Sequence, residues 1–231
     1  MPFGSTAEAV RAWVEGWVVS RGAAEPTREP WGFTVQVGLP KEVARHVLTA
    51  ADEATVRKLA ENSAAGVALK AFVPAPALQA WLPPGWGLLD GHAAFMAASL
   101  AEAEAEAEAE AETEAPPGLP DGYRLSSWRR GGVTRVVVRA ADGAFAARGQ
   151  IAVTGATAVV DQVETDPAHQ RRGLGRVVLD TLTDAGARQG ARAAVLGATE
   201  EGRALYEALG WRVLAPLSAA MRVTDAGPGA G

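Results

Sequence analysis

The residues best suited to chemistry form a short segment, 170–176, which reads Gln-Arg-Arg-Gly-Leu-Gly-Arg. A predicted strand precedes it and ends before Pro167, because proline has no N–H for a strand ladder. Apolar residues at helical spacing follow and predict a helix that opens in glycine: Leu174, Val178, Leu182 and Ala185. Such a start leaves backbone N–H groups bare at the positive helix end. The segment therefore predicts a phosphate site, to which three arginines add charge: Arg171, Arg172 and Arg176.

Two common phosphate-binding patterns do not match this segment, which contains neither G-x-G-x-x-G nor G-K-[ST]. The pattern that does fit is Q-x-x-G-x-G at 170–175, after a strand that ends V-x-T-x-P at 163–167. It resembles the acetyl-CoA signature [QR]-x-x-G-x-[GA] of the GNAT (GCN5-related) N-acetyltransferases. A second stretch, 202–211, resembles that family's motif A-x-x-L-Y-x-x-x-G-[FW], and one predicted strand, 193–198, lies between the two.

The resemblance implies an α/β (α+β) protein with the acyl-CoA N-acyltransferase (GNAT) fold, a mixed sheet flanked by helices. It also implies acetyl-CoA as co-substrate and direct transfer of acetyl to a primary amine of a small molecule, without a metal. Glycines 173 and 175 would let the CoA pyrophosphate approach the helix-start amides. An N–H of 163–165 would polarise the thioester carbonyl. The expected contacts to the co-substrate are Val163, Glu164, Thr165, Gln170, Arg171, Arg172, Gly173, Leu174, Gly175, Arg176 and Thr199.

The candidates for proton transfer are one tyrosine and two carboxylates. Tyr206 matches the family tyrosine that protonates the leaving thiolate, although its place between leucines also suits a packing aromatic. The position of the basic glutamate of many GNAT enzymes is Val159 here, and valine takes no proton. Asp161 shares a strand face with Val159, whereas Glu164 points the other way, beside the thioester. Two alternatives stay open for each carboxylate: it acts as the base, directly or through a water molecule, or it has a structural role as a hydrogen-bond acceptor. Thr199 replaces a CoA-contacting asparagine and keeps that contact only in part.

Composition excludes several classes of protein. The chain of 231 residues has no cysteine, which excludes thiol nucleophiles, disulfides and cysteine-bound metals. Its three histidines, at 46, 92 and 169, stand too far apart to predict a metal site. The net charge of −5 reflects seven glutamates within 101–114, and the basic residues are too scattered to predict a nucleic-acid face. No apolar run predicts a signal peptide or membrane span, so we expect a cytoplasmic protein.

An internal repeat predicts two lobes. Gly85-Trp86 precedes Met96, and Gly210-Trp211 precedes Met221 by the same number of residues. One offset of 125 residues therefore aligns the two Gly-Trp pairs and the two methionines. We therefore expect a degenerate GNAT-like lobe over 1–100, an Ala-Glu/Pro linker over 101–120, and the acetyl-CoA-binding domain over 121–225. The N-terminal copy turns from strand to helix through 48–52 without glycine, so it should not bind CoA.

Periodicity and turn residues predict the other elements. Helices are expected over 8–22, 52–63 and 75–82, and strands over 33–37, 43–48, 67–73, 88–89, 92–99, 123–128, 134–139, 144–153 and 157–165.

The sequence departs from the family beside its first strand. The family normally places two helices between its first two strands, where they wall the amine-acceptor site, but only residues 129–132 are available here. We expect the N-terminal lobe to cover that side of the cleft. This departure and Val159 leave an alternative open, a CoA-binding regulatory or interaction protein without catalysis. The identity of the acceptor amine and the oligomeric state, monomer or homodimer, are not readable from the sequence.

Overall fold

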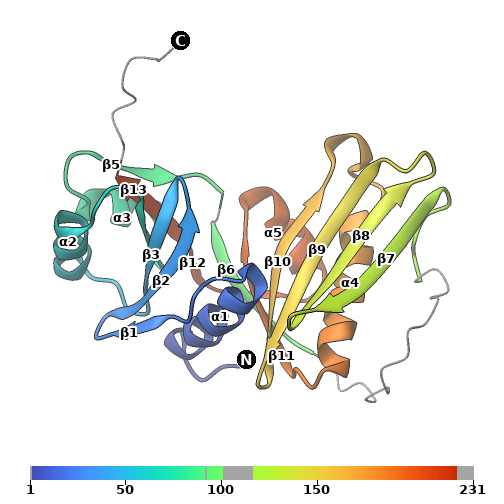
Figure 1. Cartoon of the computed structure of the whole chain (residues 1–231), viewed down its shortest axis with the longest axis horizontal. Helices are drawn as coiled ribbons and strands as arrows, with labels where there is room; N and C mark the ends of the chain where they lie inside the picture. Colours follow the sequence, from blue (N-terminus) through green and yellow to red (C-terminus); the bar gives the residue numbers. More distant parts are fainter. Residues whose placement is uncertain (1, 92, 101–116, 223–231) are drawn as a thin grey trace, which may run out of the picture.

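Two mixed β-sheets stand side by side in the computed structural model, with one helix between them and other helices on their outer sides (Figure 1). The structure describes residues 2–91, 93–100 and 117–222. Within these ranges no helix is long and apolar enough to cross a membrane. The arrangement confirms the predicted α+β class with two lobes.

The first sheet has the strand order β1-β2-β3-β4-β13-β5, in which β3 and β4 run parallel and the other neighbours antiparallel. Its strands are β1 (Thr27–Glu29), β2 (Gly32–Leu39), β3 (Glu42–Leu48), β4 (Val67–Ala71), β5 (Trp86–Leu89) and β13 (Ser218–Arg222). Helices α2 (Glu53–Asn62) and α3 (Ala75–Trp81) lie on its outer side (Figure 1). Helix α2 begins where the sequence predicts, because the Asp52 carboxylate accepts the Thr55 N–H at 2.9 Å.

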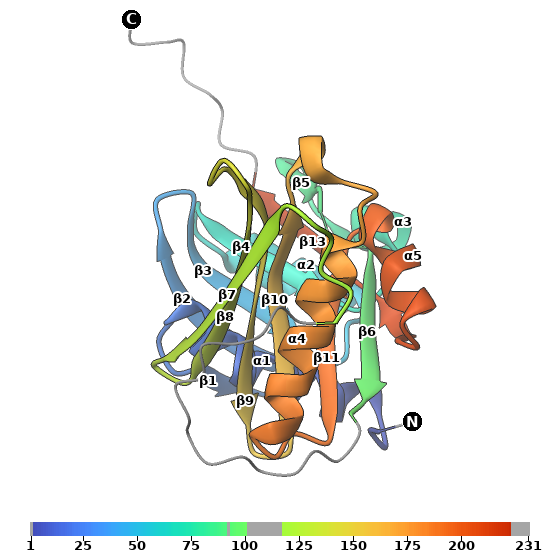
Figure 2. The same cartoon turned by 90° about the vertical axis from the view of Figure 1, so that its right-hand side faces the viewer.

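The second sheet has the strand order β12-β6-β11-β10-β9-β8-β7, with β10 and β11 parallel. Its strands are β6 (Ala94–Ser99), β7 (Tyr123–Arg130), β8 (Val133–Ala140), β9 (Phe145–Thr154), β10 (Thr157–Thr165), β11 (Ala193–Ala198) and β12 (Arg212–Pro216). Helix α4 (Leu174–Arg188) packs across its outer face through an apolar stripe that includes Val178 and Leu182 (Figure 2). Helix α5 (Glu200–Ala208) connects β11 to β12.

The two halves of the chain exchange equivalent strands. Strand β6, from the N-terminal half, lies between β11 and β12 of the second sheet. Strand β13, from the C-terminal half, lies between β4 and β5 of the first sheet. The two strands are those that carry Met96 and Met221, the equivalent methionines of the repeat. The expected boundaries at 1–100 and 121–225 therefore divide the sequence but do not divide the sheets.

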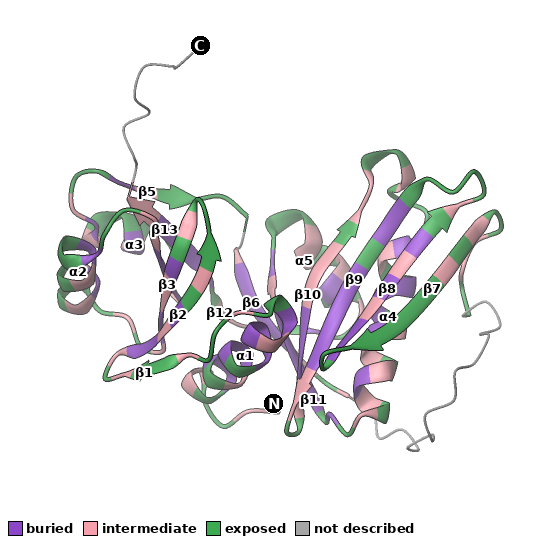
Figure 3. Cartoon of the chain, in the orientation of Figure 1, coloured by how far each residue is buried: buried purple, intermediate pink, exposed green. Residues whose placement is uncertain are grey.

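Helix α1 (Thr6–Arg21) fills the space between the sheets. It begins at Ser5, whose side chain accepts the Glu8 N–H, and ends at Gly22 in the left-handed conformation. Its buried face packs on β9 and β10, as the run of buried residues in Figure 3 shows. Gly16 permits this close approach, because a Cβ there would stand 2.4 Å from a methyl carbon of Val159. The N-terminal half thus covers this face of the second sheet, as expected.

The other predicted helices and strands are present, with small shifts at their ends. The structure adds β1, in a stretch that two prolines mark as a loop, and a short 3-10 helix at Pro167–His169. Most of the expected linker, residues 101–116, and His92 lie outside the described residues.

Candidate active site

A cavity of about 800 Å³ opens where β10 and β11 separate. The two strands pair only from Thr157 to Val159, and beyond that point the ladder between them ends. A β-bulge follows in β10, where Gln162 adopts a φ of 54°. Strands β3 and β4 of the first sheet pair over all of 44–48 and leave no such opening. Only the second sheet therefore provides a cleft between its parallel strands.

The start of α4 forms one end of this cavity. Gly173 is its N-cap, with a φ of 80° and no side-chain cap, so no side chain takes the first amides of the helix. A Cβ at Gly175 would lie 3.0 Å from Leu205, which makes glycine the residue that fits there. At the corresponding helix of the first lobe, Asp52 already caps the first turn. The free amides at the start of α4 therefore suit an anion, whereas the Asp52 carboxylate at the start of α2 would repel one.

Ten of the eleven expected co-substrate contacts line the cavity: Val163, Glu164, Thr165, Gln170, Arg171, Gly173, Leu174, Gly175, Arg176 and Thr199. The exception is Arg172, whose guanidinium donates to the Tyr123 hydroxyl at 3.0 Å, where His169 Nδ1 is also bonded at 2.9 Å. Thr199 lines the cavity but also caps α5, because its hydroxyl accepts the Gly202 N–H at 3.0 Å.

Tyr206 reaches the cavity from α5 and is only 7% exposed. Its ring packs beside Trp211, with centroids 6.0 Å apart. Burial, and secondarily the negative charge of Asp161, raises the pKa of Tyr206 to about 12. The phenol therefore keeps its proton at neutral pH and is suited to donate it.

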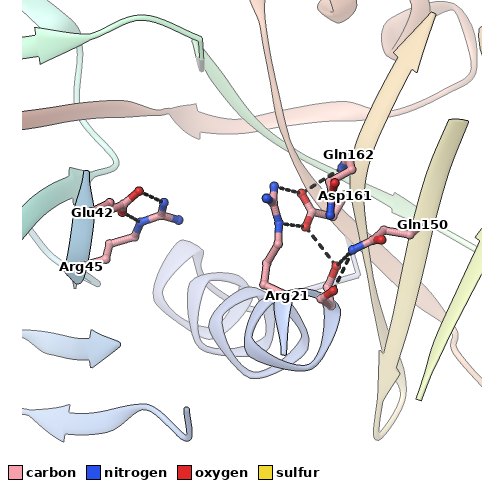
Figure 4. Close-up of polar contacts among 7 residues, drawn as sticks. Arg21, Glu42, Arg45, Gln150, Asp161 and Gln162 are labelled. Atoms are coloured by element: carbon pink, nitrogen blue, oxygen red, sulfur yellow. Dashed lines mark hydrogen bonds and ion pairs between the residues drawn. The ribbon is translucent and has the colours of Figure 1, made fainter. Parts of the chain in front are cut away.

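Asp161 lies at the centre of a polar cluster that joins α1 to β10 (Figure 4). Arg21 donates to both of its oxygens, at 2.5 and 2.8 Å. The Ser20 hydroxyl and the Gln162 N–H donate to the same carboxylate, at 3.0 and 2.9 Å. The Gln150 amide extends the cluster to β9 through Ser20, at 2.7 Å. Four hydrogen bonds thus occupy the carboxylate, and three of them come from α1.

Glu164, the second carboxylate candidate, lies at the rim of the cavity with its side chain 54% exposed. It pairs with Arg148 of β9, and the Arg148 Nε donates to it at 2.9 Å.

A family comparison now bears on this site. The model of the acetyltransferase (GNAT) family matches residues 98–211, a range that contains β10, the start of α4 and Tyr206. Residues 98–211 of the chain belong to the GNAT family.

Solved structures agree on the fold of this GNAT protein. A GCN5-related N-acetyltransferase from Kribbella flavida is 16% identical, with a TM-score of 0.61, over 96% of this chain and 97% of that one. A putative GNAT acetyltransferase from Novosphingobium aromaticivorans is 17% identical, with a TM-score of 0.54, over 93% and 97% of the two chains. These likenesses confirm the expected GNAT fold over nearly the whole length. No curated protein sequence matches the chain significantly.

Sequence reasoning missed the wall that the N-terminal half of this GNAT protein contributes. That wall consists of Trp13, Trp17, Arg21, Arg45 and Lys70. The motifs directed attention to the C-terminal half, and residues 67–73 read simply as an apolar strand. The signal that pointed to the wall was Lys70 itself, a lysine inside that apolar run. Lys70 is 4% exposed, and no other charged residue among those described is buried to this extent.

The contacts of Asp161 predict a loss of stability in Asp161→Ala. Removal of the carboxylate leaves Arg21 and Ser20 without their partner, and hydrogen bonds to a charged group contribute about 1.5–3 kcal/mol. We expect thermal unfolding of this GNAT variant to begin several degrees lower. Glu164→Ala is the matched control, because the loss of its exposed ion pair should cost less than about 1 kcal/mol. Equal unfolding temperatures in the two variants would show that Asp161 does not join α1 to the sheet.

Proposed function

We propose that this GNAT protein transfers the acetyl group of acetyl-CoA directly to a primary amine of a small molecule. The observation that carries the proposal is the cavity between β10 and β11, which leads to the uncapped start of α4. A thioester substrate with a diphosphate needs both features, a slot beside free strand amides and an anion site at its end.

The residues of the cleft suit the parts of acetyl-CoA. The amides around Gly173 and Gly175 would bind the pyrophosphate, and Arg171 and Arg176 line the same end. No hydrogen bond or ion pair joins Arg171 to another described residue, so its charge is available to a phosphate. The strand edge at 163–165 does not pair with β11, which leaves its outward N–H groups for the pantetheine arm and the thioester carbonyl.

Tyr206 would give its proton to the thiolate that leaves. Its raised pKa supports this role, because a phenol with a pKa of about 12 is fully protonated at neutral pH. The amine acceptor would enter between α1 and the start of α5. Trp13 and Trp17 form part of that side, which favours an acceptor with an apolar or aromatic portion.

Acetyl-CoA titration during thermal unfolding tests this proposal. A ligand at 100 times its dissociation constant stabilises the native state by about 2.7 kcal/mol, a shift of several degrees for a chain of this size. Gly173→Asp should lose this shift, because it sets a carboxylate at the phosphate end of the cleft. Gly143→Asp is the matched control: Gly143 also has a positive φ, 87° against 80°, and open space around it, but it lies in the β8–β9 turn.

Two outcomes would contradict the proposal. If no acyl-CoA raises the unfolding temperature of the wild type, the protein does not bind the proposed co-substrate. If acetyl-CoA still raises the unfolding temperature of Gly173→Asp, the phosphate site is not at the start of α4. A protein that binds acetyl-CoA but acetylates no amine would be the acyl-CoA-binding regulatory protein, the alternative that Val159 favours. Thiol release reports the difference without background, because the chain has no cysteine.

A further inference from the structure

Lys70 belongs to β4 of the first sheet, yet it reaches the cavity where β10 and β11 of the second sheet separate. It is fixed on both sides, because its strand neighbours are Val47 on β3 and Ala219 on β13. Its side-chain nitrogen, Nζ, stands 5.3 Å from the ring centre of Trp13. The nitrogen is thus held by the fold on the wall that the N-terminal half contributes.

The other cations on this wall already have partners. Arg45 forms two hydrogen bonds to Glu42, at 2.5 and 2.9 Å, and Arg21 forms two to Asp161. Lys70 has no hydrogen bond or ion pair with any residue in the described part of the chain. A buried ammonium without a carboxylate is costly, so the neutral amine is the favoured form in this position.

The charges that face Lys70 come from three elements: Arg45 and Glu42 on β3, Asp161 on β10 and Arg21 on α1. Burial, followed by Arg45, lowers its pKa to about 7, while Glu42 and Asp161 act in the opposite direction. A general base is most effective when its pKa lies near the working pH.

We propose that Lys70 is the general base of the transfer, which takes the proton from the ammonium form of the acceptor inside the cavity. This inference rests on the proposed acetyl transfer. The two carboxylates that the sequence offered as the base are committed elsewhere, Asp161 to Arg21 and Ser20 and Glu164 to Arg148. A third carboxylate that lines the cavity, Glu201, is exposed in the first turn of α5. Lys70 and Tyr206 line the same cavity and both sense the charge of Asp161, so the base and the acid face one site.

The step balances without another reactant. The acceptor ammonium gives one proton to the Lys70 amine, and the freed amine forms a C–N bond to the thioester carbonyl carbon. The C–S bond then breaks. Tyr206 gives its proton to the thiolate and recovers one from the nitrogen that becomes the amide. Lys70 releases its proton to solvent, so each turnover yields the amide, the CoA thiol and one proton.

The titration of Lys70 is the first test and needs no acceptor. The chain has three lysines, at 41, 58 and 70, and reductive methylation with ¹³C-formaldehyde gives each a methyl signal in NMR spectra. Lys70→Arg identifies the signal of Lys70. We expect that signal to titrate near pH 7. A Lys70 signal that does not titrate around neutral pH would overturn the proposal.

Turnover is the second test, with two probe amines of similar size. Ethylamine is an ammonium at neutral pH, whereas 2,2,2-trifluoroethylamine is already largely neutral. Lys70→Met should reduce thiol release with ethylamine about 100-fold or more, since general base catalysis contributes roughly 10²–10⁴-fold. It should change release with trifluoroethylamine by only a few fold. The wild-type rate with ethylamine should rise through pH 7 and then level off, whereas the rate of the variant should keep rising with the share of neutral ethylamine.

Matched variants separate the outcomes. Lys58→Met makes the same change on the surface of α2 and should behave as wild type. Equal losses with both probe amines, or no loss with ethylamine, would overturn the role of Lys70. An acetyl group found on Lys70 by peptide mass spectrometry would also overturn it, because Lys70 would then be the acceptor. A wild type that does not bind acetyl-CoA would instead contradict the proposed function.

Discussion

Residues 1–100 and 117–231, produced as separate polypeptides, are expected to remain unfolded alone and to form a stable one-to-one complex when produced together. Each half lacks a strand from the interior of a sheet. Without β13, β4 and β5 lose the strand between them, and without β6, β11 and β12 lose theirs. Strand β6 also carries Phe95 and Met96, both fully buried in cores of the complete chain. Circular dichroism of each half and gel filtration of the mixture measure this directly.

A shorter second fragment provides the control. Residues 117–217 contain every strand of the second sheet except β6 and lack β13. The mixture with 1–100, which supplies β6, should therefore complete only the second sheet. Trp86, which packs in the core of the first lobe, should then remain exposed to solvent, as in an unfolded segment. A fragment 1–100 that folds by itself to a stable monomer would contradict the role of the exchanged strand.

Lys70→Met is expected to stabilise the protein at neutral and acidic pH by several kcal/mol. Lowering the pKa of Lys70 from 10.5 to about 7 corresponds to roughly 5 kcal/mol. Between these pH values the unfolded chain binds a proton that the folded chain does not, so the stability of the wild type rises with pH. The free energy of unfolding of Lys70→Met lacks this dependence on pH, because methionine does not titrate.

Urea unfolding at pH 6, 8 and 10 measures the difference. The advantage of Lys70→Met should be largest at pH 6 and should shrink as the pH rises toward 10.5. Lys58→Met should follow the wild type at every pH, because Lys58 is exposed. Parallel curves for wild type and Lys70→Met would mean that the buried amine keeps its ordinary pKa.

The features that the sequence predicted are local in the chain. Glycine at 173 and 175 and the apolar spacing of α4 lie within a few turns of each other, so the start of this helix was readable. The start of α2 at residue 52 was readable for the same reason. The position of Tyr206 on the cavity followed from a motif of ten residues, and its burial explains why it also reads as a packing aromatic.

The features that the sequence did not predict depend on distant contacts. Strand β6 is a short apolar run, AFMAAS, which suits the interior of either sheet, so nothing in its residues assigns it to the second one. Arg172 lies in the segment 170–176, but its side chain bonds the Tyr123 hydroxyl and does not line the cavity. Asp161 and Lys70 acquire their roles from α1 and β3, whose positions no local pattern fixes. Chemistry at this site therefore emerges from the way the two halves meet.

The exchanged strands also set the order in which the molecule can be completed during synthesis. Strands β4 and β5 leave the ribosome long before β13, and the Ser218 hydroxyl bonds a carbonyl 145 positions earlier in the chain. Until β13 arrives, β4 exposes unpaired N–H and C=O groups on one edge. Pairing over such a separation is slow, and an open edge invites contact with other nascent chains. The lobe that is translated first therefore finishes folding last, and protection of that edge by chaperones would improve the yield of soluble protein.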